Sequence, residues 1–134
     1  MRPELKVSNS FDLLDPRIVE MLRQRGITEP TPPQNQAIGK ILSGKNVLLI
    51  APTGSGKTEA AILPVFNRML SERTEPVSTL FITPLRALNR DLLERLKVYS
   101  AHLGFRVQVR HSDISQAQRR EIADKPADIL ITTP

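Results

Sequence analysis

Apolar residues near the start of the chain recur at the spacing of one helix face. Leu14, Ile18 and Leu22 lie four residues apart, which predicts an amphipathic helix. Asp15 and Pro16 have the composition of a helix start, because an aspartate accepts hydrogen bonds from free N–H groups and a proline fits the first helical position. The pattern therefore predicts a helix that begins at about residue 15.

A second helix and a strand are predicted further along. Residues 32–43 are flanked by Thr31, a suitable N-cap, and by Gly44, a suitable terminator. The run NVLLIA at 46–51 is apolar almost throughout and has the length of a strand. Such a run is typical of a strand covered on both faces, as in a parallel sheet. We therefore expect a buried strand directly before the glycine-rich segment that follows.

A third helix is expected after Gly56, and Pro64 lies within it. Because proline removes a hydrogen bond and clashes with the preceding turn, we expect a kink or an early break near residue 60. The clearest helical pattern comes later, where apolar residues step by three or four positions: Leu88, Leu92, Leu96, Tyr99 and Leu103.

The second half of the chain alternates strands with helices. Three strands are predicted, at 78–83, 106–111 and 128–133. Ser115 and Gln118 form a capping box for a short helix that ends near Asp124. Regular alternation of strand and helix predicts an α/β fold, with a parallel sheet flanked by helices on both faces.

The composition fits one folded domain. The chain has 134 residues, of which 40% are hydrophobic and 25% charged, so it can bury a core. The absence of cysteine excludes disulfides, zinc–thiolate sites and a thiol nucleophile. No apolar run approaches the roughly 18–20 residues of a membrane span, and the N-terminus lacks the apolar core of a secretory signal. We therefore expect no membrane contact and a cytoplasmic location.

The charge balance favours an anionic partner without requiring one. The chain carries 19 Lys and Arg against 14 Asp and Glu, a formal net charge of +5. A positive excess is typical of proteins that bind polyanions such as nucleic acids. Ordinary solubility explains the same excess, so the charge alone leaves both interpretations open.

The segment LLIAPTGSGKTEAAI, residues 48–62, carries the candidate chemistry. N–H groups at a helix N-terminus have no intrahelical partner, and the helix dipole adds partial positive charge there. A glycine-rich turn lets these amides converge on an anion, while Lys57 reaches the outer phosphates and the Thr58 hydroxyl ligates Mg²⁺. This is the P-loop arrangement for nucleoside triphosphates, although Ala51 replaces its usual first glycine. The alternative is a surface turn that exposes a lysine.

This segment and several others resemble the conserved motifs of the superfamily 2 nucleic-acid helicases, and those of the large helicase-related (Lhr-type) proteins above all. APTGSGKTEA resembles motif I, and the family's other blocks follow in order: ITEPTPPQNQAI for the Q motif, TPLRALNRDLLERL for motif Ia, and ILITTP for the segment ahead of motif II. The resemblance implies the N-terminal part of a RecA-like P-loop domain that uses ATP and Mg²⁺. It divides the chain into a Q-motif helical segment, 1–45, and a P-loop α/β core, 46–134.

The resemblance implies two sets of binding residues. The nucleotide set is Phe11, Gln34, Thr53, Gly54, Ser55, Gly56, Lys57 and Thr58, with Lys57 and Thr58 also catalytic and Thr58 the Mg²⁺ ligand. The nucleic-acid set is Pro84, Arg86, Asn89 and Thr133, which would contact the DNA or RNA backbone with low sequence specificity.

Several members of these sets have a second interpretation. The amide of Gln34 can pair with adenine N6 and N7, or it is only a polar residue near a helix start. The ring of Phe11 stacks on the base, or it packs in the core. Arg86 binds a phosphate, or it is a solvated helix residue. Ser112 replaces a glycine that the Lhr-type pattern commonly has, so this loop is left out of the site, and the neighbouring His111 is interpreted as structural.

The family's motif II, motif III and second RecA-like domain would all follow Pro134. Phosphoryl transfer depends on such charged groups, and an arginine finger alone contributes about 10³–10⁵ in rate. We therefore expect this chain by itself not to hydrolyse ATP, and the second RecA-like domain of the parent to be its partner. A P-loop enzyme that is no helicase and a non-catalytic nucleic-acid-binding module are the alternatives. DNA versus RNA, polarity, unwinding versus annealing and the oligomeric state are left open.

Overall fold

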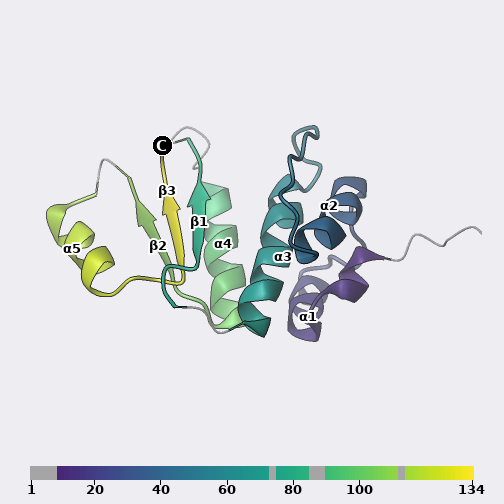
Figure 1. Ribbon diagram of the computed structural model, residues 1–134, viewed down its shortest axis with the longest axis horizontal. Coiled ribbons are helices and arrows are strands. Elements are labelled where there is room, and N and C mark those ends of the chain that lie inside the picture. The colour runs from purple at the N-terminus through teal and green to yellow at the C-terminus, as the bar shows by residue number, and fades with distance from the viewer. Residues whose placement is uncertain (1–8, 73–74, 85–89, 112–113) are drawn as a thin grey trace, which may run out of the picture. The chain divides into compact units, whose positions relative to one another are not determined.

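The computed structural model describes residues 9–72, 75–84, 90–111 and 114–134 (Figure 1). Contacts within the chain define two compact units, Met1–Arg73 and Thr74–Pro134. The first unit therefore includes the glycine-rich loop and the helix after it, whereas the motif pattern divides the chain at residue 45. This difference arises because the helix after the loop packs mainly against the helix that precedes the loop.

The first unit is helical. Its described residues form a short 3₁₀-helix and three α-helices: η1 Ser10–Leu13, α1 Pro16–Gln24, α2 Pro32–Leu42 and α3 Lys57–Ser71. The two helices predicted to begin near residues 15 and 32 are thereby confirmed. Their apolar faces meet α3 in a core whose fully buried side chains include Ile18, Leu22, Ile38, Leu63 and Phe66. Removing these side chains from water is the main stabilising term of this unit.

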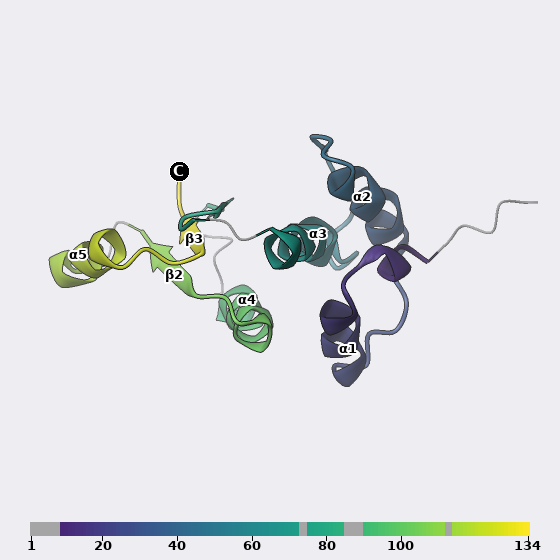
Figure 2. The same cartoon turned by 60° about the horizontal axis from the view of Figure 1, so that its bottom comes forward.

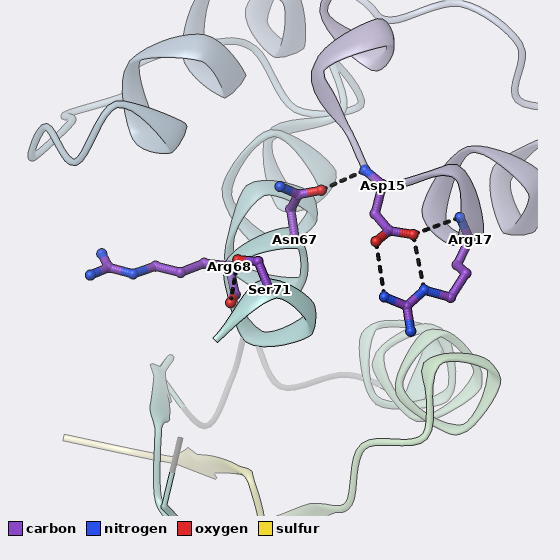
Figure 3. A network of polar contacts seen from close by, with 5 residues as sticks. All are labelled: Asp15, Arg17, Asn67, Arg68 and Ser71. Atoms are coloured by element: carbon purple, nitrogen blue, oxygen red, sulfur yellow. Dashed lines mark hydrogen bonds and ion pairs between the residues drawn. The ribbon is translucent and has the colours of Figure 1, made fainter. Parts of the chain in front are cut away.

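Polar contacts fix the start of α1 (Figure 3). The Asp15 side chain caps the helix by accepting the Arg17 N–H at 2.9 Å, and it pairs with the Arg17 guanidinium at 2.9 and 3.0 Å. The Asp15 N–H donates to Asn67 Oδ1 of α3 at 2.5 Å. The guanidinium of Arg17, and then its backbone N–H, lower the pKa of the Asp15 carboxyl below its usual value. One residue therefore caps α1 and ties it to α3.

The early break predicted for α3 does not occur. The helix runs from Lys57 to Ser71 with Pro64 inside it. Proline costs the helix one hydrogen bond, but the side chains of Ile62, Leu63, Pro64 and Phe66 are all buried. Packing of this face outweighs the local preference for a break.

The strand predicted at 46–51 is also absent, and this expectation was wrong. Residues 45–52 carry no regular secondary structure, and Leu48 and Ile50 are each 86% exposed. A strand needs a neighbour to bond its backbone. In the described part of the chain, the three strands pair among themselves and none pairs with this run. An apolar pattern can suggest a strand, but it does not supply the partner.

The described residues of the second unit form a parallel sheet and two helices. Its elements are β1 Thr79–Ile82, α4 Arg90–Leu103, β2 Val107–Arg110, α5 Gln116–Asp124 and β3 Ile129–Thr132. The strand order is β1-β3-β2, and both pairs are parallel. The three predicted strands and the capped helix before residue 124 are therefore confirmed. The chain crosses from β1 to β2 over α4 and returns to β3 over α5, and right-handed crossovers in opposite directions place the two helices on opposite sides of the sheet (Figure 2).

Helix α4 buries the predicted apolar face. Leu92, Leu96 and Tyr99 are nearly inaccessible, as are Ile129 and Ile131 of the central strand β3. Leu88, the first member of the predicted pattern, lies outside the described residues. The core of the second unit is therefore the layer between α4 and the sheet, and the three parallel strands end along one edge of that sheet.

The Asp15 contacts predict a pH-dependent contribution to the stability of the first unit. Asp15→Asn keeps an N-cap acceptor but loses the ion pair, whereas Asp15→Ala also loses the cap, which costs about 1 kcal/mol. Because the folded-state pKa is lowered, the ion-pair contribution is present above the unfolded pKa of about 3.9 and is lost as the pH falls through the folded value. We measure the free energy of unfolding in denaturant from pH 7 to pH 3.

At pH 7 we expect wild type to be the most stable, then the Asn variant, then the Ala variant. Towards pH 3 the difference between wild type and Asp15→Asn closes, while the difference between the Asn and Ala variants persists, because Asn still caps the helix. A wild-type advantage over Asp15→Asn that does not change with pH would contradict the ion-pair assignment.

Candidate nucleotide-binding site

The glycine-rich loop forms a tight turn at the N-terminus of α3. The Ser55 N–H and the Ser55 hydroxyl both donate to the Pro52 carbonyl, at 3.3 and 2.6 Å. Gly54 and Gly56 have φ values of +80° and +81°, which side-chain-bearing residues rarely adopt. The two glycines thus allow the chain to turn directly into the helix, whose first amides point out of its end.

Lys57 lies at this turn and folds back over it. Its side chain is exposed, and Nζ donates to the Ala51 carbonyl at 2.7 Å. Thr53 and Gly54 are exposed, and Thr58 is half-buried. The loop therefore offers free helix amides, a lysine ammonium and a threonine hydroxyl within one short segment. This is the set of donors that a triphosphate and its Mg²⁺ need.

Two side chains from the start of α2 hold the loop. The Thr31 hydroxyl donates to the Ser55 carbonyl at 2.7 Å, and Gln34 Nε2 donates to the Gly56 carbonyl at 3.2 Å. The other end of the Gln34 amide accepts the Thr31 N–H at 2.9 Å. The sequence pattern placed Gln34 in the site but not Thr31. The signal available for Thr31 was its position three residues before Gln34, the spacing of a capping box.

Gln34 is nearly buried, at 4% exposure, and its amide is already engaged at both ends. Each end keeps further capacity, because an amide has two hydrogens on nitrogen and two lone pairs on oxygen. Pairing with adenine therefore remains chemically compatible with these contacts, and it stays a prediction. The contacts show directly that Gln34 joins α2 to the loop.

Phe11 lies in η1 and is only 3% exposed. Its neighbour Ser10 donates its N–H to Asn35 Oδ1 of α2 at 2.9 Å, which fixes η1 on that helix. In this structure the ring of Phe11 packs in the core of the first unit, so the packing interpretation describes its present position. Stacking on a base would require the ring to become accessible, and that role stays a prediction.

The predicted nucleic-acid residues belong to the second unit. Pro84 is exposed and follows β1, and Thr133 is half-buried and follows β3, so both lie at the edge where the parallel strands end. Arg86 and Asn89 lie outside the described residues. Arg110, which the sequence pattern did not include, is the exposed last residue of β2, and its Cα is in register with that of Thr132.

Other kinds of site lack support in the part of the chain that the structure describes. There, no three His, Asp or Glu side chains gather as a group that could hold a metal ion. Within the same residues, no helix has both the length and the apolar character to cross a bilayer.

A glycine turn that ends in lysine and threonine at a helix N-terminus, together with a parallel α/β sheet, defines the nucleotide-binding part of a RecA-like P-loop domain. The chain belongs to the DEAD/DEAH box helicase family, since the sequence model of that family matches residues 31–134.

Relatives within this family include helicases of the Lhr type. The chain is 35% identical to ATP-dependent helicase Lhr-Core of Methanocaldococcus jannaschii over 100% of its own length and 18% of the relative's. It is 40% identical to Lhr-Core of Saccharolobus solfataricus over 92% of its length and 16% of the relative's. The resemblance to Lhr-type proteins is thereby confirmed, and the chain spans less than a fifth of either relative.

A solved structure supports the same assignment. Mycobacterium smegmatis helicase Lhr bound to ssDNA and AMP-PNP matches 95% of this chain, and 18% of that protein, with a TM-score of 0.82 and 32% identity. The RecA-like α/β fold expected from the motifs is therefore confirmed.

The loop geometry predicts that a side chain at position 56 would disturb the contact between the loop and α2. An added Cβ at Gly56 would collide with Gln34 Nε2 and lie 3.3 Å from Thr31 Oγ1. Gly44 provides a matched control, because its φ is +86° and a Cβ there would meet nothing within 4 Å. Both alanine variants should lose about 1–2 kcal/mol for the left-handed backbone.

Only Gly56→Ala should in addition separate the loop from α2 and weaken binding of a Mg²⁺–ATP analogue. Thermal unfolding and calorimetric titration measure the two effects separately. Equal nucleotide affinity in the two variants would show that the contact with α2 does not matter for the site.

Proposed function

We propose that this chain is the ATP-binding portion of an ATP-dependent DNA or RNA helicase or translocase. The observation that carries the proposal is the loop at the N-terminus of α3, where Lys57 Nζ lies 2.7 Å from the Ala51 carbonyl. An exposed lysine ammonium held beside the helix N-terminus is positioned to bind a phosphate oxygen. Membership of the helicase family and the Lhr-type relatives support the same function.

Hydrolysis of ATP would supply the energy for the helicase, and this chain would bind and orient the phosphates of ATP. The amides of residues 54–58 and the Lys57 ammonium would bind the phosphate oxygens. The Thr58 hydroxyl would ligate Mg²⁺, for which a hard oxygen donor is suitable. Thr53 and Ser55 would complete the turn. Gln34 is proposed to pair with the adenine base. Phe11 is proposed to stack on it, which requires its buried ring to become accessible.

The nucleic acid would bind where the parallel strands of the second unit end. Pro84 and Thr133 lie at that edge, and Arg86 and Asn89 are proposed to extend the contact. Main-chain amides and arginines bind the phosphate backbone, which carries no sequence information, so low sequence specificity follows. The Lhr relative of known structure is bound to ssDNA, which supports a single-stranded ligand for this chain also.

A second RecA-like domain of the parent protein is the proposed partner. Hydrolysis needs an acidic group for Mg²⁺ and water and a stabilising arginine, and we propose that both come from outside the present chain. A cytoplasmic location, expected from the sequence, stays part of this proposal.

Lys57→Ala tests the ATP site. In the full-length helicase we expect the variant to lose ATP hydrolysis by at least about 100-fold, because one charge that stabilises the transition state is removed. Lys45→Ala, an exposed lysine of the same unit outside the loop, is the control and should leave the rate unchanged. The isolated 134-residue chain should show no turnover. If the isolated chain hydrolysed ATP and Lys57→Ala abolished that activity, the proposal that groups outside the chain are needed for hydrolysis would be refuted.

Arg110→Gln tests the nucleic-acid edge. Arg106 is a matched control, because it is also exposed but precedes β2 at the opposite edge of the sheet. Loss of one phosphate contact should reduce the salt slope of single-strand binding by about 0.7 for Arg110→Gln. Arg106→Gln should keep the wild-type slope. The salt slope is measured by fluorescence anisotropy with a labelled single strand at several salt concentrations. Equal slopes for the two variants would show that Arg110 does not contact the nucleic acid.

A further inference from the structure

We propose that the outer edge of β2 binds an extended, acidic segment of a partner polypeptide by β-strand addition. This β2 edge consists of the main chain of Val107 and Val109, with the side chains of Arg106 and Arg110 at its two ends. The inference concerns a protein partner. It goes beyond the proposed binding of ATP and nucleic acid and depends on neither.

The main chain of the β2 edge is unpaired. β2 is an outer strand of the order β1-β3-β2 (Figure 1). In a parallel pair, every second residue directs both its N–H and its C=O to the neighbouring strand. The Arg106 carbonyl accepts the Ile129 N–H at 3.1 Å, so the even-numbered residues of β2 face β3. Val107 and Val109 therefore direct their N–H and C=O groups outward, and within the described residues these groups have no hydrogen-bond partner.

The neighbouring elements leave this edge accessible. The helix that follows β2, α5, has no buried residue, so it packs only lightly on the rest of the unit. The Gln108 side chain donates to the Lys125 carbonyl and accepts the Ala127 N–H, both at 3.0 Å. Its amide is thus engaged with the segment between α5 and β3 and does not cap the outward groups of β2.

The pattern of outward groups matches a polypeptide. Two N–H donors and two C=O acceptors alternate along the edge, and the two outward residues lie about 6.6 Å apart. An extended peptide presents the complementary alternation, and strand addition to a free edge is a common mode of peptide recognition. The phosphate backbone of a nucleic acid offers acceptors but no donors for the two carbonyls, so it would match only half of the pattern.

The charges at the two ends favour an acidic partner. Arg106 and Arg110 are both exposed and lie four residues apart, or about 13 Å, on one face of the strand. If the β2 edges of two copies paired in antiparallel fashion, Arg106 of one would lie beside Arg110 of the other, which is repulsive. An extended segment with carboxylates four residues apart would instead place one beside each arginine.

The test uses the 134-residue chain without nucleotide and a synthetic peptide, acetyl-Glu-Val-Thr-Val-Glu-amide. Its glutamates are four residues apart in either strand direction. A peptide with Lys in place of both Glu is the control. An exposed ion pair contributes up to about 5-fold in affinity, and the Lys peptide replaces two such pairs by repulsions. By calorimetric titration we therefore expect the Glu peptide to bind wild type about 5-fold or more tightly than the Lys peptide.

Arg106→Glu tests the contribution of charge. Arg106 is suitable because it lies away from the edge where the nucleic-acid contact is proposed, whereas Arg110 lies at that edge. In this variant each peptide meets one attractive and one repulsive charge, so the preference for the Glu peptide should disappear. Lys97→Glu makes the same change at an exposed residue of α4 and should keep the preference. An equal preference in wild type and Arg106→Glu would contradict the assignment.

Hydrogen exchange on the wild-type chain tests the main-chain contacts and needs no substitution. Addition of the Glu peptide should slow exchange of the Val107 and Val109 amides. The amides of Leu80 and Ile82, the outward residues of the β1 edge, are the control and should not change. Unchanged exchange at Val107 and Val109 with millimolar peptide would overturn the inference.

Two other occupants would also be revealed by this experiment. If the Val107 and Val109 amides of the free chain became protected as its concentration rose, and sedimentation showed a dimer, the edge would pair with a second copy. If a single-stranded oligonucleotide protected these amides and the peptide did not, the edge would bind nucleic acid. Either result would overturn the assignment of an acidic polypeptide partner.

Discussion

The hydrogen bonds between the start of α2 and the carbonyls of the glycine-rich loop are the contacts on which the candidate site depends. A loop of glycines is conformationally free, and two residues in left-handed conformations would not hold one shape by themselves. Thr31 and Gln34 bind two successive carbonyls and so define that shape. The capping residues of one helix thereby present the free N-terminus of the next. Stability of the helical unit and geometry of the phosphate site are consequently coupled.

Contacts elsewhere in the same unit hold α3, the helix that carries the candidate site, in place. The hydrogen bond between Asp15 and Asn67 ties α1 to the C-terminal part of α3, whereas the loop precedes the N-terminus of that helix. The apolar faces of α1 and α2 cover α3. Because α3 carries Lys57 and Thr58 at its first turn, any displacement of this helix would move the two residues that are proposed to bind the outer phosphates and Mg²⁺. The buried Phe11 belongs to this support in the present structure.

Local chemistry could be predicted from the sequence, whereas contacts between distant segments could be predicted only in part: the parallel sheet was, but the environment of residues 46–51 was not. The caps at Asp15, Thr31 and Ser115 were correct because each depends only on residues two or three positions away. The run at 46–51 was misassigned because a strand depends on a partner strand, which the apolar pattern does not contain. The break near residue 60 was misassigned because the proline preference is local, whereas the burial of Phe66 and its neighbours is not. The capping pattern identified Thr31 as a cap, but it did not predict the tertiary contact of Thr31 with Ser55, 24 residues further along the chain.

The central claim is that the amides and the ammonium at the start of α3 bind the triphosphate of ATP. The most direct test is a crystal structure of the chain with Mg²⁺ and a non-hydrolysable ATP analogue. We predict that the phosphates lie against the amides of residues 54–58 and that Lys57 Nζ leaves the Ala51 carbonyl for a phosphate oxygen. A nucleotide bound elsewhere, with Lys57 still on Ala51 at saturating ligand, would contradict the account.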